Sequence, residues 1–266
     1  MLAIISAIIV GATTGTLIYR QAGLGWGITA GFLVFGVIYI AIGLLIFAKV
    51  KKINKSIQEL MQLASQKLNR QMQQLQMKPQ GGIKSMQKML EKEQNKALLK
   101  AIEMTKAAEP LFHWNLMLKK QISTMRMMFY YQMKDFEQVD LLMPRSMVFS
   151  DPRALSMKIA RQFVNKDPKL ELSLKKLKRF KGDAAVPLYA LASWVRVKQN
   201  KIEEAVKLLV DARSKCDNAV INKNWEVLVN GNVKKFSNAS LGDEWYALYL
   251  EEAKIKTKKA RRGGFR

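Results

Sequence analysis

The first 48 residues contain a single charged side chain, Arg20, and this constrains the fold more than any other feature of the sequence. Leu2–Tyr19 and Leu24–Ala48 are uncharged stretches that flank a short turn ending at Gly23. At about 1.5 Å per residue, the first stretch is about 27 Å long as a helix and the second is longer. The first is just enough to cross a hydrocarbon core of about 30 Å, and the second can span it with some tilt. We therefore expect a transmembrane helical hairpin over residues 1–48.

Each expected span carries one G-x-x-x-G motif, Gly11–Gly15 in the first and Gly27–Gly31 in the second. Small residues at this spacing let helix backbones approach closely. Both motifs lie toward the loop, so we expect them to face each other within one hairpin, with a dimer seam as the alternative. A cleaved signal peptide is disfavoured because the first stretch lacks a basic n-region and a second full span follows it. Ionisable residues are missing inside both spans, which argues against an ion pathway and indicates an anchor.

Residues 49–266 hold 44 basic and 21 acidic residues, a net charge of 44 − 21 = +23. Four lysines follow the second span at once: Lys49, Lys51, Lys52 and Lys55. The short loop has only Arg20, so the positive-inside rule places both termini in the cytoplasm. We expect an integral protein of the bacterial inner membrane. The lone cysteine, Cys216, excludes a disulfide framework and suits a reducing compartment.

A juxtamembrane segment over residues 49–82 follows the hairpin. Its apolar residues recur at spacings of three and four from Ile53 to Leu75, which predicts an amphipathic helix. The apolar stripe can pack on the chain's own domain, lie on the membrane surface, or form a short coiled coil that makes a homo-oligomer. The stretch Lys78–Gly82 contains Pro and two Gly and is the clearest linker in the chain.

From residue 83 onward, helix breakers recur at short intervals and strand-like alternation is not evident, which predicts an all-α domain over residues 83–253. We expect a first helix over 83–108, a further hairpin over 219–239 and a closing helix over 243–259. The breakers are Lys134-Asp135, Asp151-Pro152, Asp167-Pro168, Gly182-Asp183, Gln199-Asn200, Asp217-Asn218, Asn230-Gly231-Asn232 and Gly242-Asp243.

One predicted helix pair, over residues 189–212, resembles a tetratricopeptide repeat (TPR). Tyr189 and Ser193 match the aromatic and small positions of the repeat's first helix. Asn200 stands at the usual turn glycine, and Ala205 and Ala212 fill the small positions of the second helix. Small residues at these places let the two helices of a pair cross closely.

Two more degenerate units precede this pair, with Val139 and Ser173 at the place of Ala205. The steps are 173 − 139 = 34 and 205 − 173 = 32 residues, which bracket the 34-residue period of the TPR family. The resemblance covers roughly residues 115–217. It implies an α-solenoid of stacked helix pairs, whose first helices line a groove for peptides or helices.

Carried over by this resemblance, the groove positions are Thr124, Met128, Tyr131 and Gln132 in the first unit and Ala190, Trp194, Val197 and Lys198 in the third. Most are apolar or aromatic, so a clamp for a chaperone's terminal carboxylate is excluded. An apolar groove fits an apolar helix or strand, from a protein partner or from this chain itself. The alternative is that Met128 and Trp194 are core residues.

The C-terminal tail over residues 254–266 contains seven basic residues and no acidic one. Such a tail beside a membrane attracts anionic lipid at about 1 kcal/mol per basic residue, and it also attracts nucleic acid. A motif for sequence-specific nucleic-acid binding is not evident. The basic residues are Lys254, Lys256, Lys258, Lys259, Arg261, Arg262 and Arg266.

The sequence offers no catalytic constellation, phosphate loop or metal-ligand spacing, so we expect a non-enzymatic protein without a cofactor. The main hypothesis is a membrane-anchored cytoplasmic scaffold or adaptor that binds a protein partner through its TPR-like domain. One alternative is a membrane tether for RNA, DNA or ribosomes through the basic surface. Another is a non-catalytic subunit of a larger membrane complex.

Overall fold

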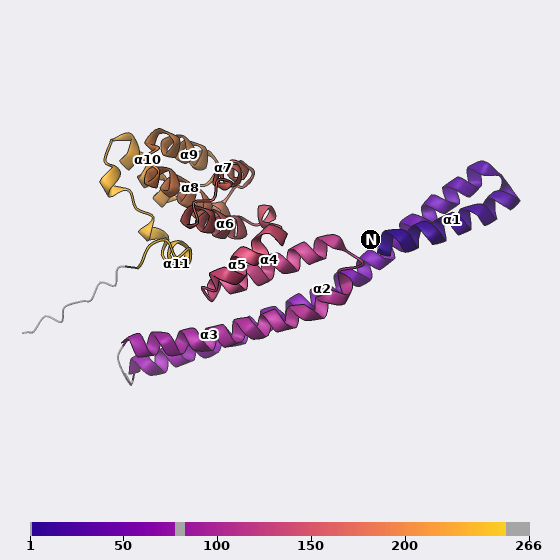
Figure 1. The fold of residues 1–266 in the computed structure, drawn as a ribbon, viewed down its shortest axis with the longest axis horizontal. Helices are drawn as coiled ribbons and strands as arrows, with labels where there is room; N and C mark the ends of the chain where they lie inside the picture. The colour runs from indigo at the N-terminus through magenta and orange to yellow at the C-terminus, as the bar shows by residue number, and fades with distance from the viewer. Residues whose placement is uncertain (1, 78–82, 254–266) are drawn as a thin grey trace, which may run out of the picture. The chain divides into compact units, whose positions relative to one another are not determined.

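The computed structural model describes residues 2–77 and 83–253, and the regular elements in these ranges are all helices (Figure 1). The all-α expectation is confirmed for these residues. The chain divides into two compact units, Met1–Met147 and Val148–Arg266, and each is described by itself.

The first unit is built mostly from long helices. They are α1 (Leu2–Ala22), α2 (Leu24–Met77), α3 (Ile83–Thr105), the 3₁₀ turn η1 (Lys106–Leu111), α4 (Leu116–Gln132), α5 (Phe136–Leu142) and η2 (Met143–Arg145). The second unit has shorter helices. They are η3 (Val148–Ser150), α6 (Pro152–Val164), α7 (Leu170–Lys175), η4 (Lys176–Arg179), η5 (Asp183–Ala185), α8 (Val186–Lys198), α9 (Ile202–Lys215), α10 (Ala219–Val229), η6 (Val233–Lys235), η7 (Ala239–Leu241) and α11 (Asp243–Tyr246).

The two N-terminal helices form an antiparallel hairpin whose backbones touch at the glycine motifs (Figure 1). A Cβ atom added at Gly15 would lie 2.9 Å from the carbonyl oxygen of Gly27, and one added at Gly11 would lie 2.8 Å from that of Gly31. The chain reverses at Gly23, whose φ of +89° favours glycine. The expectation that the two motifs face each other within one hairpin is confirmed.

The second apolar stretch and the amphipathic segment are one unbroken helix, α2, of 54 residues. Beyond the apolar stretch, its stripe packs along α3, with Ile57 only 5% exposed. The Lys67 ammonium of α2 lies 2.9 Å from the Glu93 carboxylate of α3. Of the three alternatives for the stripe, packing on the chain's own helices is the one observed. The expected linker 78–82 lies outside the described residues.

Four helices end in the same backbone turn. At Lys134, Lys166, Asn200 and Gly231 the φ angle is positive, between 52° and 70°. At each turn this residue donates its N–H three residues back, and the next residue donates five residues back, which is the Schellman pattern. The turns follow α4, α6, α8 and α10 and coincide with sequence breakers. The predicted helix ends are therefore confirmed at these four places.

Helix α8 forms the centre of the second unit's core. Leu188, Leu191 and Val195 are fully buried there, and α8 contacts α6, α9 and α10. The helix needs apolar residues on every side because neighbours cover it all round. Ala205 and Ala212 of α9 are also fully buried, which suits a close crossing of α8 and α9.

Three expected elements differ from the observed ones. The helix expected over 83–108 stops at Thr105, where a 3₁₀ turn containing Pro110 begins. Only α10 forms in the hairpin expected over 219–239, because the chain then continues in 3₁₀ turns. The closing helix expected over 243–259 ends at Tyr246, and the chain continues in turns and bends with a positive φ of +54° at Tyr249. Residues 254–266 lie outside the described residues.

Candidate interaction sites

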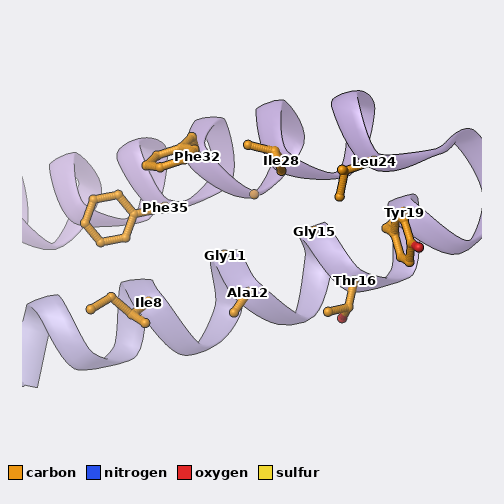
Figure 2. Close-up of a pocket in the computed structure, with 12 residues that line it drawn as sticks. Ile8, Gly11, Ala12, Gly15, Thr16, Tyr19, Leu24, Ile28, Phe32 and Phe35 are labelled. Carbon is orange, nitrogen blue, oxygen red and sulfur yellow. The ribbon is translucent and has the colours of Figure 1, made fainter.

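The hairpin presents an apolar groove along its glycine seam. Its volume is about 550 Å³, and Figure 2 shows that α1 and α2 both line it. Within the described ranges, α1 and the first part of α2 are long and apolar enough to cross a membrane by length and composition. The outward side chains of this hairpin are mostly exposed and apolar, as a lipid-facing surface requires.

The four groove positions expected in the first repeat unit lie on α4. Two of them, Thr124 and Tyr131, are buried. Tyr131 is 1% exposed and packs edge-on against Phe136, with ring centroids 5.6 Å apart. The Thr124 hydroxyl donates to the Lys120 carbonyl at 2.8 Å and accepts from the Met147 N–H at 2.7 Å. Met128 and Gln132 are half-buried.

The four groove positions expected in the third repeat unit share one face of α8. Ala190 is fully buried and Trp194 is 6% exposed, whereas Val197 is half-buried and Lys198 is exposed. The Lys198 ammonium lies 5.2 Å from the centroid of the Trp194 ring. This face is therefore covered around Ala190 and Trp194 and becomes accessible toward the C-terminal end of α8.

The cover is a segment of the same chain, residues 236–251, which we call the C-terminal strap. The Trp194 and Trp245 rings pack edge to face at 5.7 Å. Both indole N–H groups donate to the Glu251 carboxylate, at 2.8 Å from Trp194 and 2.9 Å from Trp245. Ala190, Trp194 and Trp245 all belong to the buried core of the second unit, so the alternative that Trp194 is a core residue is the one observed.

A pair of asparagines completes the attachment of the strap. Asn238 is fully buried and donates its side-chain N–H to the Ala190 carbonyl at 2.9 Å. Asn224 of α10 donates to the Asn238 side-chain oxygen at 2.7 Å. No sequence motif predicts that Asn224, Asn238 and Glu251 make this attachment. Apart from Trp245, which is 6 residues from Glu251, their partners are 13 to 57 residues away, so local spacing carries no signal of them.

The buried Arg196 links three short helices, α7, α8 and α9. Arg196 of α8 donates twice to the Glu171 carboxylate of α7, each bond being 2.6 Å long. Its Nε lies 3.0 Å from a carboxylate oxygen of Glu204 on α9. The hydrogen bond from Arg196 lowers the pKa of Glu171, because it favours the carboxylate form. Arg196 therefore has a structural role, because its bidentate hydrogen bonds join α8 to α7.

A basic surface covers α7 and η4. Lys175, Lys176, Lys178 and Arg179 are all exposed there. Neighbouring Lys158 is half-buried, and its pKa is lowered, first by burial and then by the charge of Lys176. The patch therefore offers concentrated positive charge to an anionic surface. The seven basic residues predicted in the tail, Lys254 to Arg266, lie outside the described residues.

The remaining reactive side chain, Cys216, is 2% exposed, and burial raises the pKa of its thiol. Such a thiol is a poor nucleophile because little thiolate is present. Across residues 2–77 and 83–253, no group of three His, Cys, Asp or Glu side chains is arranged to hold a metal ion. Searches of protein-family models, curated proteins and solved structures find no match to this chain.

Proposed function

We propose that this protein is a membrane-anchored, non-enzymatic scaffold that holds a helical protein-binding domain beside a cytoplasmic membrane surface. One observation carries the proposal. Helix α2 runs unbroken from the apolar hairpin into the stalk it forms with α3, so the anchor and the stalk are one continuous element. The four lysines that follow the apolar stretch support a cytoplasmic position for everything beyond it.

The partner proposed for the scaffold is a protein segment with apolar side chains. The four equivalent helix-end turns and the small residues of the α8–α9 pair support a TPR-like repeat. The α8 face packs against a second segment, the C-terminal strap, through the Trp194–Trp245 ring contact and the hydrogen bond to Glu251, which supports a face suited to binding. Beside its accessible end lies a cavity of about 360 Å³ with a mixed lining of apolar and charged residues: Phe163, Pro168, Leu170, Lys166, Asp167, Glu171 and Gln199.

Site-specific photocrosslinking tests this proposal. A photoreactive amino acid at Lys198, beside the open end of the groove, should give a discrete protein adduct in the native membrane. The same group at Lys207, exposed on α9, is the matched control and should not give that adduct. The adduct should still form when irradiation is carried out near 0.5 M salt, where screening acts within about 4–5 Å, because apolar contacts hold the complex together. Identical adducts at both positions, or none at either, would contradict a groove-bound partner.

The basic surface of α7 and η4 favours a second candidate, a membrane tether for nucleic acid. If this surface binds single-stranded RNA, the logarithm of the binding constant should fall as the logarithm of the salt concentration rises. The slope should be about −0.7 for each phosphate that the surface neutralises. Replacing Lys175, Lys176, Lys178 and Arg179 with Gln in the full chain should reduce that slope as well as the affinity. A variant that binds RNA as the parent does would remove this patch from consideration.

A further inference from the structure

The segment that joins α3 to α4 packs against the apolar part of α2. We call residues 106–120 the corner. Ala108 and Leu118 of the corner form a buried cluster with Ile46 of α2, and Leu111 and Phe112 pack around it. The Leu2 N–H at the start of α1 donates to the His113 carbonyl at 3.0 Å. The corner is thus attached to both helices of the hairpin.

The depth of this contact follows from the length of α2. A hydrocarbon core of about 30 Å takes about 20 helical residues, and counted from Leu24 these end near Gly43. A cavity of about 330 Å³ lies at this level, lined by Ala3 and Ile4 of α1, Tyr39, Gly43 and Ile46 of α2, and Trp114, Asn115 and Met117 of the corner. Trp114 and Met117 therefore lie level with the end of the hydrocarbon layer and not beyond it.

The exposed side chains of the corner suit this depth. Trp114 is 38% exposed and Met117 is 49% exposed, although both lie beside apolar hairpin residues. Tryptophan concentrates at membrane–water interfaces, where its ring is buried and its N–H meets headgroups. Lys119 and Lys120 are exposed within one turn of Met117 and can reach lipid phosphates with their ammonium groups.

We propose that the corner inserts Trp114 and Met117 into the interfacial layer of the membrane that the hairpin spans, making a third contact with phospholipid. The inference rests on the proposed membrane insertion of the hairpin and extends it. A hairpin alone leaves the stalk free to tilt about the membrane surface. A corner held at the interface restricts that tilt, because the corner packs directly on Ile42, Ile46 and Val50 of α2.

Quenching by lipids brominated near the headgroup end of their acyl chains tests the inference on the full chain in phosphatidylcholine vesicles. A small environment-sensitive fluorophore is attached at Met117→Cys. Ile40→Cys, 61% exposed on α2, reports hairpin insertion, and Lys92→Cys, exposed on α3, reports the aqueous stalk. Native Cys216 is buried, and the unmodified chain gives the background labelling. Quenching at 117 should lie within about twofold of that at 40 and clearly exceed that at 92.

The outcomes separate the two proposals. Quenching at 40 without quenching at 117 would overturn the interfacial corner and leave the hairpin anchor standing. Absence of quenching at 40 would overturn membrane insertion of the hairpin, and the corner with it. Trp114→Glu should at least halve the quenching at 117 without changing that at 40, whereas Trp114→Phe should retain it. Equal quenching in the Trp114→Glu chain would show that Trp114 does not hold the corner in the interface.

Discussion

Single residues decide where the short helices of this protein stop. The Schellman turn requires a positive φ, which glycine adopts without a Cβ clash and lysine adopts only at a cost. Gly231 satisfies this requirement, but Lys134 and Lys166 have φ values of 61° and 52°. The chain therefore carries strain at two of its four equivalent turns.

Lys166→Gly should stabilise the second unit. The exposed lysine side chain leaves a φ of 52° that glycine adopts freely, so the expected gain is about 1 kcal/mol. Thermal unfolding of the full chain, followed by circular dichroism, should show a higher melting temperature. Lys175→Gly is the control, because the exposed Lys175 has a helical φ of −62° and should lose stability instead. A lower melting temperature for Lys166→Gly would show that the lysine side chain contributes more than the turn strain costs.

The hairpin seam likewise depends on single glycines. A Cβ atom at Gly27 would lie 2.8 Å from the Gly15 carbonyl oxygen and 3.0 Å from the Tyr19 Cα, and backbone atoms cannot move aside cheaply. Gly27→Ala should therefore separate α1 from α2, at a cost of about 1–3 kcal/mol. Gly36→Ala, in the same helix with open space around it, is the matched control.

Spin labels on cysteines at Ile9 and Val37, which are exposed on α1 and α2, can measure this separation in detergent. The distance distribution should shift or broaden in Gly27→Ala and match the parent in Gly36→Ala. Equal distributions in all three chains would show that the glycine contact does not set the helix spacing.

At the scale of elements, local sequence signals predicted helix ends and the contact between α1 and α2, but not the other helices' partners. Breakers such as Lys134-Asp135 and Gln199-Asn200 located helix ends, because the required backbone turn is local. Apolar spacing predicted the stripe of α2, but only packing shows that α3 covers it. The covering of Trp194 by Trp245 and Glu251 depends on residues about 50 positions apart, which periodicity does not encode. The same limit applies to the buried Asn224–Asn238 pair.

The α8–α9 pair provides a direct test of close helix crossing. Ala205 is fully buried where α9 packs on α8, so Ala205→Trp should overpack the pair by about 1–3 kcal/mol or more. Val210→Trp is the control on the same helix, since Val210 is 52% exposed. The full chain should melt at a lower temperature with the first substitution and near the parent's with the second. An unchanged melt for Ala205→Trp would contradict a tight crossing at this residue.

At the scale of the whole molecule, the proposed topology depends on charge outside the hairpin and on the continuity of α2. The lysines directly after the apolar stretch, Lys49, Lys51, Lys52 and Lys55, oppose transfer of the following region across the membrane. A membrane-impermeant maleimide added to intact cells should therefore label Gln21→Cys, which is exposed at the hairpin turn. It should label Gln94→Cys, exposed on α3, only after the membrane is permeabilised. The unmodified chain is the control, because Cys216 is buried. Labelling of position 94 in intact cells would reverse the orientation and place the helical domain outside.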